Sequence, residues 1–148
     1  MSYNDLRKGR LSLVGGEYFL TCVVHNRRPV FTDFKFCRIL VKEMSFLESC
    51  GILSWSAWVI MPNHFHGLVT PKNGSLSNAV KQLNGRSARK INNEVGATKP
   101  LWQPEFYDHA LREEEDRISI ARYIVANPLR AGLVTNIAEY PHWDSIFL

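Results

Sequence analysis

Two histidines separated by a single residue are the part of this sequence best suited to metal chemistry. His64 and His66 flank Phe65 and follow 61–63, a Met-Pro-Asn segment short enough for a hairpin connection. Because side chains alternate between the faces of a strand, the two imidazoles project from one face and Phe65 from the other. Two imidazoles side by side can hold one divalent cation. The alternative is a pair of hairpin histidines whose nitrogens are satisfied by backbone and water.

A tyrosine and an asparagine on a predicted helix are candidates for the rest of such a site. Tyr123 and Asn127 are four residues apart, so they share one face of the helix. The Asn127 amide offers a neutral oxygen ligand suited to Mg²⁺ or Mn²⁺, and the Tyr123 phenol is a potential nucleophile. Each also has an ordinary structural interpretation, as a half-buried aromatic and as the last helical residue before proline.

The charge distribution indicates a polyanionic partner. Residues 1–100 carry 14 Lys and Arg against 6 Asp and Glu, whereas residues 101–148 carry 4 against 8. A basic surface on a small domain favours nucleic acid, although a merely solvated surface is the alternative.

Length and composition predict one cytoplasmic domain. The 148 residues are 45% hydrophobic, enough for one core, and no run approaches the roughly 20 apolar residues that a bilayer requires. We therefore expect no membrane partner. The three cysteines have no metal-binding spacing, which favours free thiols. Residues 1–14 are expected to form a mobile basic arm, and 135–148 a tail whose aromatics pack on the body.

The hydrophobic pattern predicts the elements that must position these side chains. Strands are expected at Glu17–Val24, Leu53–Ile60, the histidine segment and Phe106–Leu111, and helices at Asp33–Cys50, from Ser75 or Ser77 to Val95, and from the acidic run at 113–116 to Asn127. The order is strand, helix, strand, strand, helix, strand, helix. It predicts an α+β, ferredoxin-like (RRM-like) antiparallel sheet with helices on one face, plus a C-terminal helix carrying the tyrosine.

Three blocks in this order resemble a known family. They are Met61-Pro62-Asn63-His64-Phe65-His66, the segment from Leu101-Trp102-Gln103 to Ala110, and Tyr123-Ile124-Val125-Ala126-Asn127-Pro128-Leu129-Arg130-Ala131-Gly132. The chain resembles the REP-associated tyrosine transposases of the HUH single-tyrosine transposase superfamily, from about Tyr18 to Tyr140.

The resemblance implies a metal-dependent single-stranded DNA endonuclease and strand transferase acting near hairpin DNA. It implies Tyr123 as the nucleophile that forms a 5′-phosphotyrosine link, and His64, His66 and Asn127 as ligands of Mg²⁺ or Mn²⁺. Single-stranded or hairpin DNA would be the partner, and a homodimer is a possibility that the sequence leaves open. The residues expected to contact DNA are Arg27, Arg28, Lys81, Arg86, Arg89, Lys90, Trp102, Gln103 and Arg130.

Two other functions fit the same residues. A non-catalytic single-stranded nucleic-acid-binding module would use the same sheet and basic helix, with aromatic stacking. A metal hydrolase would use water in place of Tyr123 as nucleophile. No obvious base for deprotonating the tyrosine is visible in the sequence.

Overall fold

The fold is known from a computed structural model that describes residues 16–112 and 116–147. The predicted basic arm at 1–14 and the acidic residues 113–115 lie outside this range. The elements are β1 (Tyr18–Val23), η1 (His25–Arg27), η2 (Val30–Thr32), α2 (Phe34–Ser49), β2 (Leu53–Met61), β3 (His64–Pro71), α3 (Leu76–Val95), β4 (Tyr107–Ala110), α4 (Arg117–Val125), α5 (Asn127–Arg130), η3 (Ile137–Glu139) and β5 (Trp143–Ser145).

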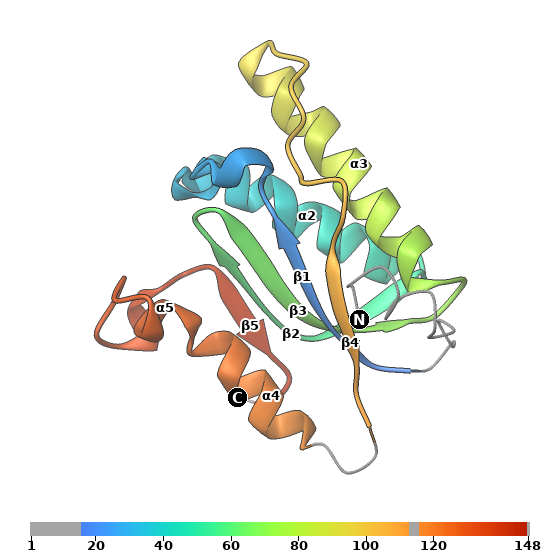
Figure 1. The fold of residues 1–148 in the computed structure, drawn as a ribbon, viewed down its shortest axis with the longest axis vertical. Coiled ribbons are helices and arrows are strands. Elements are labelled where there is room, and N and C mark those ends of the chain that lie inside the picture. The colour runs from blue at the N-terminus through green and yellow to red at the C-terminus, as the bar shows by residue number, and fades with distance from the viewer. Residues whose placement is uncertain (1–15, 113–115, 148) are drawn as a thin grey trace.

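The strands form one antiparallel sheet in the order β4-β1-β3-β2-β5 (Figure 1). The first four follow the predicted ferredoxin-like order, so the α+β fold class is confirmed. β5 was not predicted, because only three residues of the tail pair with β2. The aromatics Tyr140, Trp143 and Phe147 pack on the body, as expected.

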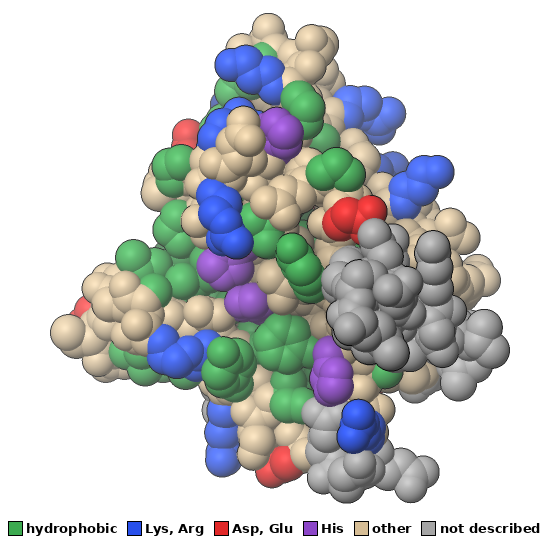
Figure 2. All heavy atoms as spheres, in the orientation of Figure 1, with side chains coloured by type: hydrophobic (Ala, Val, Ile, Leu, Met, Phe, Trp, Pro, Cys, Tyr) green, Lys and Arg blue, Asp and Glu red, His purple; other side chains and the backbone are tan. Residues whose placement is uncertain are grey.

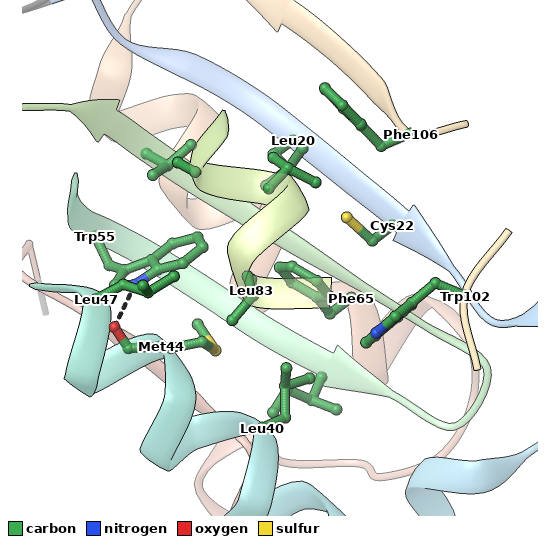
Figure 3. Close-up of a cluster of buried hydrophobic side chains, with 14 of the residues drawn as sticks. Leu20, Cys22, Leu40, Met44, Leu47, Trp55, Phe65, Leu83, Trp102 and Phe106 are labelled. Atoms are coloured by element: carbon green, nitrogen blue, oxygen red, sulfur yellow. Dashed lines mark hydrogen bonds between the residues drawn. The ribbon is translucent and has the colours of Figure 1, made fainter. Parts of the chain in front are cut away.

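Helices α2 and α3 cover one face of the sheet and enclose the main core (Figure 1). Side chains of Asp33 and Ser75 accept hydrogen bonds from the first turns of these helices, which fixes where each begins. Gly96, with φ of 65°, ends α3 in a left-handed conformation that glycine adopts without strain. Figure 3 shows Phe65 and Trp102 among the aliphatic side chains of this core.

A bulge in β2 adapts the sheet to a large side chain. The register shifts between Trp55 and Ala57, opposite Val69 and Leu68 of β3. The Trp55 indole then lies over Gly67, where an added Cβ would come within 2.6 Å of the ring. Glycine at 67 is therefore a packing requirement, and the Trp55 indole nitrogen donates to the Met44 carbonyl of α2 over 3.1 Å (Figure 3).

Helix α4 packs on the opposite face of the sheet. Its Ala121 and Ile124 contact a second, smaller core whose sheet residues are Ala57, Val59, Met61 and Leu68. Alternation along β3 separates the two layers: Phe65 joins the core under α2 and α3, whereas Leu68 joins the core under α4. In the described ranges, no helix combines the length and apolar content needed to cross a bilayer.

Candidate active site on the open sheet face

His64 and His66 lie side by side on the face of the sheet that α4 partly covers. Their ring centroids are 4.7 Å apart with an interplanar angle of 75°. Phe65 between them is completely buried on the other face. The predicted alternation is thus confirmed, and Figure 2 shows histidine side chains near the centre of this face, with basic and hydrophobic side chains around them.

Hydrogen bonds hold the two imidazoles by the same nitrogen. His64 Nδ1 lies 2.7 Å from Asn63 Oδ1, and His66 Nδ1 lies 2.7 Å from Thr21 Oγ1. An amide oxygen only accepts, so this contact is a hydrogen bond when His64 carries its proton on Nδ1; the Thr21 hydroxyl can accept from His66 in the same way. In this tautomer each Nε2 carries a lone pair, which is the state that a metal ligand needs.

The surroundings keep both imidazoles uncharged. Burial, then the charges of His64 and Arg130, lowers the pKa of His66 to about 3. Burial and the Arg27 guanidinium also lower the pKa of His64. At neutral pH the two rings are therefore neutral, and a cation can bind without displacing protons from them.

Tyr123 lies on α4 beside the histidines. Phe19 of β1 connects the two: its ring centroid is 5.4 Å from that of His66 and 6.2 Å from that of Tyr123. Tyr123 is 54% exposed. The Arg130 guanidinium lies 3.7 Å over the Tyr123 ring, which brings a positive charge to the same place.

Asn127 lies where α4 gives way to α5. Helix α4 ends at Val125, Ala126 lies between the two helices, and Asn127 begins α5 immediately before Pro128. The residue is partly exposed. Its placement one turn beyond Tyr123 agrees with the sequence spacing, and its role as a metal ligand stays a prediction.

The two arginines predicted to contact DNA from the first loop differ in their surroundings. Arg27 is exposed and its charge acts on His64. Asn26 and Arg27 have φ angles of 57° and 52°. Positive φ is uncommon for residues other than glycine, and here it occurs in the loop beside the site. Arg28 instead donates to the carbonyl oxygens of His25 and Pro100, at 3.2 and 2.6 Å, and so ties two loops together.

The basic residues of α3 also fall into two groups. Lys81 and Arg89 are exposed. Arg86 and Lys90 form ion pairs with Glu43 of α2, whose side chain is 1% exposed. Burial alone would raise the pKa of the Glu43 carboxyl, but the hydrogen bonds and charges of Lys90 and Arg86 outweigh burial and lower it. These two cations thus neutralise a buried carboxylate, and their contact with DNA remains a prediction.

Trp102 is largely buried in the structure. Its side chain is 7% exposed and stacks on Phe31 with a centroid separation of 5.5 Å, while its indole nitrogen donates to Ser87 Oγ over 3.0 Å. A ring held in this way is part of the core, and its contact with DNA remains a prediction. Gln103 is partly exposed, and its backbone N–H donates to Val23 of β1.

Three residues of this site carried no assigned role in the sequence analysis. Thr21 and Phe19 owe their positions to the pairing of β1 with β3, where Thr21 stands opposite His66 and Phe19 opposite Leu68, whereas Asn63 lies in the turn between β2 and β3. Tyr107 of β4 stands opposite Thr21 in the sheet and, like Tyr123 of α4, is exposed. Thr21 and Phe19 could not be assigned to the site without the strand register. Asn63 could have been assigned from its position next to His64.

Comparison with protein families gives one match that covers most of the chain. A family described as "Transposase IS200 like" matches residues 13–127. The REP-associated tyrosine transposase of Escherichia coli K12 is 28% identical over 134 residues, which cover 89% of this chain and 78% of that protein. A putative REP-associated tyrosine transposase of Haemophilus influenzae Rd is 25% identical over 142 residues, covering 86% and 78%.

Solved structures give the same relationship. A REP-associated tyrosine transposase bound to a REP hairpin superimposes with a TM-score of 0.75 at 26% identity, covering 90% of this chain and 79% of that one. A putative transposase from Deinococcus radiodurans R1 has a TM-score of 0.56 at 24% identity, covering 78% and 93%, and shares the fold.

Proposed function

The chain belongs to the IS200-like transposase family, and we propose that it cleaves and rejoins single-stranded DNA near a hairpin through a covalent bond to Tyr123. The observation that carries this proposal is the cluster in which Phe19 contacts both His66 and Tyr123. Phe19 thereby links the proposed nucleophile on α4 with the imidazole pair on β3.

The donor set fits a divalent cation. Both histidines are neutral and are held through Nδ1, which leaves Nε2 available for coordination. Among the described residues, no group of three or more His, Cys, Asp or Glu side chains could hold a metal. We propose the Asn127 amide, one helical turn after Tyr123, as a further oxygen ligand in a site for Mg²⁺ or Mn²⁺. When bound, such a cation would withdraw charge from the scissile phosphate.

Tyr123 would supply the nucleophile. The phenol loses its proton, and its oxygen forms a bond to phosphorus as the bond from phosphorus to the 3′ oxygen breaks. The 3′ oxygen takes up one proton, so the products are a 5′-phosphotyrosine and a 3′-hydroxyl. Because one phosphodiester replaces another, a second 3′-hydroxyl can reverse the step and join a new end. The exposure of Tyr123 suits a nucleophile that must reach the substrate strand.

Two arginines would orient the phosphate. Arg130 lies over the Tyr123 ring and its charge also acts on His66, while the charge of Arg27, in the loop that follows β1, acts on His64. A phosphate bound between these two guanidiniums would lie close to two positive charges. These charges would stabilise the negative charge of the pentavalent transition state.

Covalent trapping tests this proposal. Hairpin DNA with single-stranded flanks, labelled at its 3′ end, should become attached to the protein in Mn²⁺, and Tyr123→Phe should abolish the adduct. Tyr107→Phe is the matched control, because Tyr107 is an exposed tyrosine on β4 of the same sheet. Adduct formation that persists in Tyr123→Phe would remove Tyr123 from the reaction.

The same assay separates the alternative functions. A non-catalytic binding module would retain the hairpin in EDTA and give neither cleavage nor an adduct with any variant. Cleavage that continues in Tyr123→Phe without an adduct would indicate a hydrolase that uses water. The proposed strand transferase instead requires adduct and cleavage to disappear together.

A further inference from the structure

An ion pair joins the start of α4 to the residue that precedes β1. Arg117, the first residue of α4, donates from Nε and from a terminal guanidinium nitrogen to the two carboxylate oxygens of Glu17, over 2.6 and 2.7 Å. The two residues are 100 positions apart in the sequence. Most exposed ion pairs contribute little to a fold, but a two-point contact between guanidinium and carboxylate is the geometry that does contribute. The function proposed above makes no use of this pair.

The bulge in β2 supplies a third member of this contact. Ser56 is the residue between Trp55 and Ala57, where the register shifts. It is buried, and its hydroxyl donates to a Glu17 carboxylate oxygen over 2.9 Å. A bulge redirects a side chain that regular strand pairing would place elsewhere. The irregularity in β2 therefore serves the Glu17 carboxylate as well as the Trp55 ring.

The C-terminal tail closes over the same place. The Ile146 N–H donates to the Ser56 carbonyl oxygen over 2.9 Å, and the Arg117 guanidinium lies 5.1 Å from the centroid of the Phe147 ring. Figure 1 shows α4 lying beside β5, with which it is in contact. Four segments far apart in the sequence thus meet here. We call Glu17, Ser56 and Arg117 the clamp.

Helix formation alone does not explain an arginine at this position. The N-terminus of a helix carries the positive end of its dipole, so a cation in the first turn is unfavourable there. The Asp116 carboxylate already caps α4 by accepting from the N–H of Ile118. Arg117 is therefore explained by its contact with Glu17, which holds the start of the helix against the sheet.

Helix α4 requires anchoring to the body of the protein. It has 9 residues, and helices shorter than about 12–15 residues are marginal on their own. Its contribution to the second core comes from small or medium side chains, Ala121 and Ile124. At 1.5 Å per residue, Tyr123 lies ~9 Å along the axis from Arg117. Any slide or rotation of the helix at Arg117 therefore moves the Tyr123 ring relative to Phe19 and His66.

We propose that the clamp fixes the position of α4 on the sheet and thereby holds Tyr123 beside the imidazole pair. Glu17 and Arg117 are then positioning residues for the attack on phosphorus. This inference rests on the proposed function for the reaction that the clamp serves. It adds a determinant of the reaction rate that lies at the other end of α4 from the nucleophile.

Separating rate from affinity tests the inference. The rate of adduct formation is measured in a single turnover with saturating hairpin DNA and Mn²⁺, and hairpin affinity is measured by fluorescence anisotropy in the Tyr123→Phe background. We expect Arg117→Gln and Glu17→Gln each to slow adduct formation by roughly 10- to 100-fold, because misplacing a reacting group by ~1 Å can cost 100-fold. Hairpin affinity should not change.

Two comparisons show whether the pair acts as a unit. The double variant Glu17→Gln/Arg117→Gln should be no slower than the slower single variant, because both substitutions remove the same contact. Lys35→Gln removes an exposed ion pair with Glu94 that joins α2 to α3, and it should change neither rate nor affinity.

The position of Tyr123 can be read without any activity. The chain has 5 tyrosines, which fluorotyrosine can replace, and the ¹⁹F resonance of Tyr123 is identified by its loss in Tyr123→Phe. In Arg117→Gln we expect this resonance to shift or broaden while those of Tyr107 and Tyr140 stay in place. Lys35→Gln should leave all of them unchanged.

Three outcomes would overturn the inference. They are an unchanged adduct rate in folded Arg117→Gln, a slower rate with an unmoved Tyr123 resonance, and a loss of hairpin affinity at an unchanged rate, which would make Arg117 a DNA contact. If the parent protein forms no adduct, the proposed function fails by itself. The ¹⁹F spectrum then still decides whether the clamp sets the position of Tyr123.

Discussion

The two faces of the sheet use their polar residues in opposite ways. On the face covered by α2 and α3, the charges of Arg86 and Lys90 are paired with the buried Glu43. On the other face, Arg27 and Arg130 act on His64 and His66, whose pKa values they help to lower. The first arrangement neutralises charge within the fold, whereas the second leaves positive charge beside neutral ligands, where an anionic substrate can meet it.

The comparison is sharpest within β3, where adjacent residues face the two environments. Phe65→Ala removes a fully buried ring from the main core, so we expect it to lower the free energy of unfolding by ~3–5 kcal/mol. His66→Ala removes one partly buried ring with a hydrogen bond to Thr21, for which we expect a loss of about 1 kcal/mol. Urea denaturation in EDTA measures both. Equal losses would contradict the assignment of one face to packing and the other to chemistry.

Much of the fold could be predicted because its signals are local. Residues close together in the sequence determine the apolar spacing of α2 and α3 and their caps at Asp33 and Ser75. The same is true of the short hairpin before His64. β5 could not be predicted, because three residues have no periodicity of their own and the strand exists only through pairing with β2.

The surroundings of individual side chains were harder to predict than the elements. From sequence, Trp102 in an aromatic loop could stack on a base or belong to the core. Its contacts with Phe31 and Ser87 show that it belongs to the core. Arg86 lies off the apolar stripe of α3, yet it meets Glu43 because α2 packs alongside. The site itself was predicted in part: spacing indicated His64 and His66, but Thr21 required the register of β1.

That register predicts an effect of Thr21 on metal binding. Thr21→Val replaces the hydroxyl that contacts His66 Nδ1 by a methyl group of similar size, so the imidazole loses the partner that fixes its orientation and tautomer. We expect Mn²⁺ affinity, measured by titration calorimetry, to fall about 10- to 100-fold, as is usual when such a supporting contact is removed. Thr70→Val, on the same strand as His66 but away from it, is the control. Unchanged affinity in Thr21→Val would mean that other contacts orient His66.

The salt dependence of DNA binding distinguishes the charges of the two faces. Arg27→Gln removes a cation that acts on His64, so the slope of log affinity against log salt should become less negative by about 0.7, the value for one phosphate contact with a single strand. Arg86→Gln should leave the slope unchanged and instead lower the urea midpoint, because Glu43 loses a hydrogen-bonding partner and remains buried. A slope that changes in Arg86→Gln as much as in Arg27→Gln would place DNA on the helical face as well, as the sequence alone suggested. Comparing the two variants thus tests whether the ion pair with Glu43 prevents Arg86 of α3 from contacting DNA.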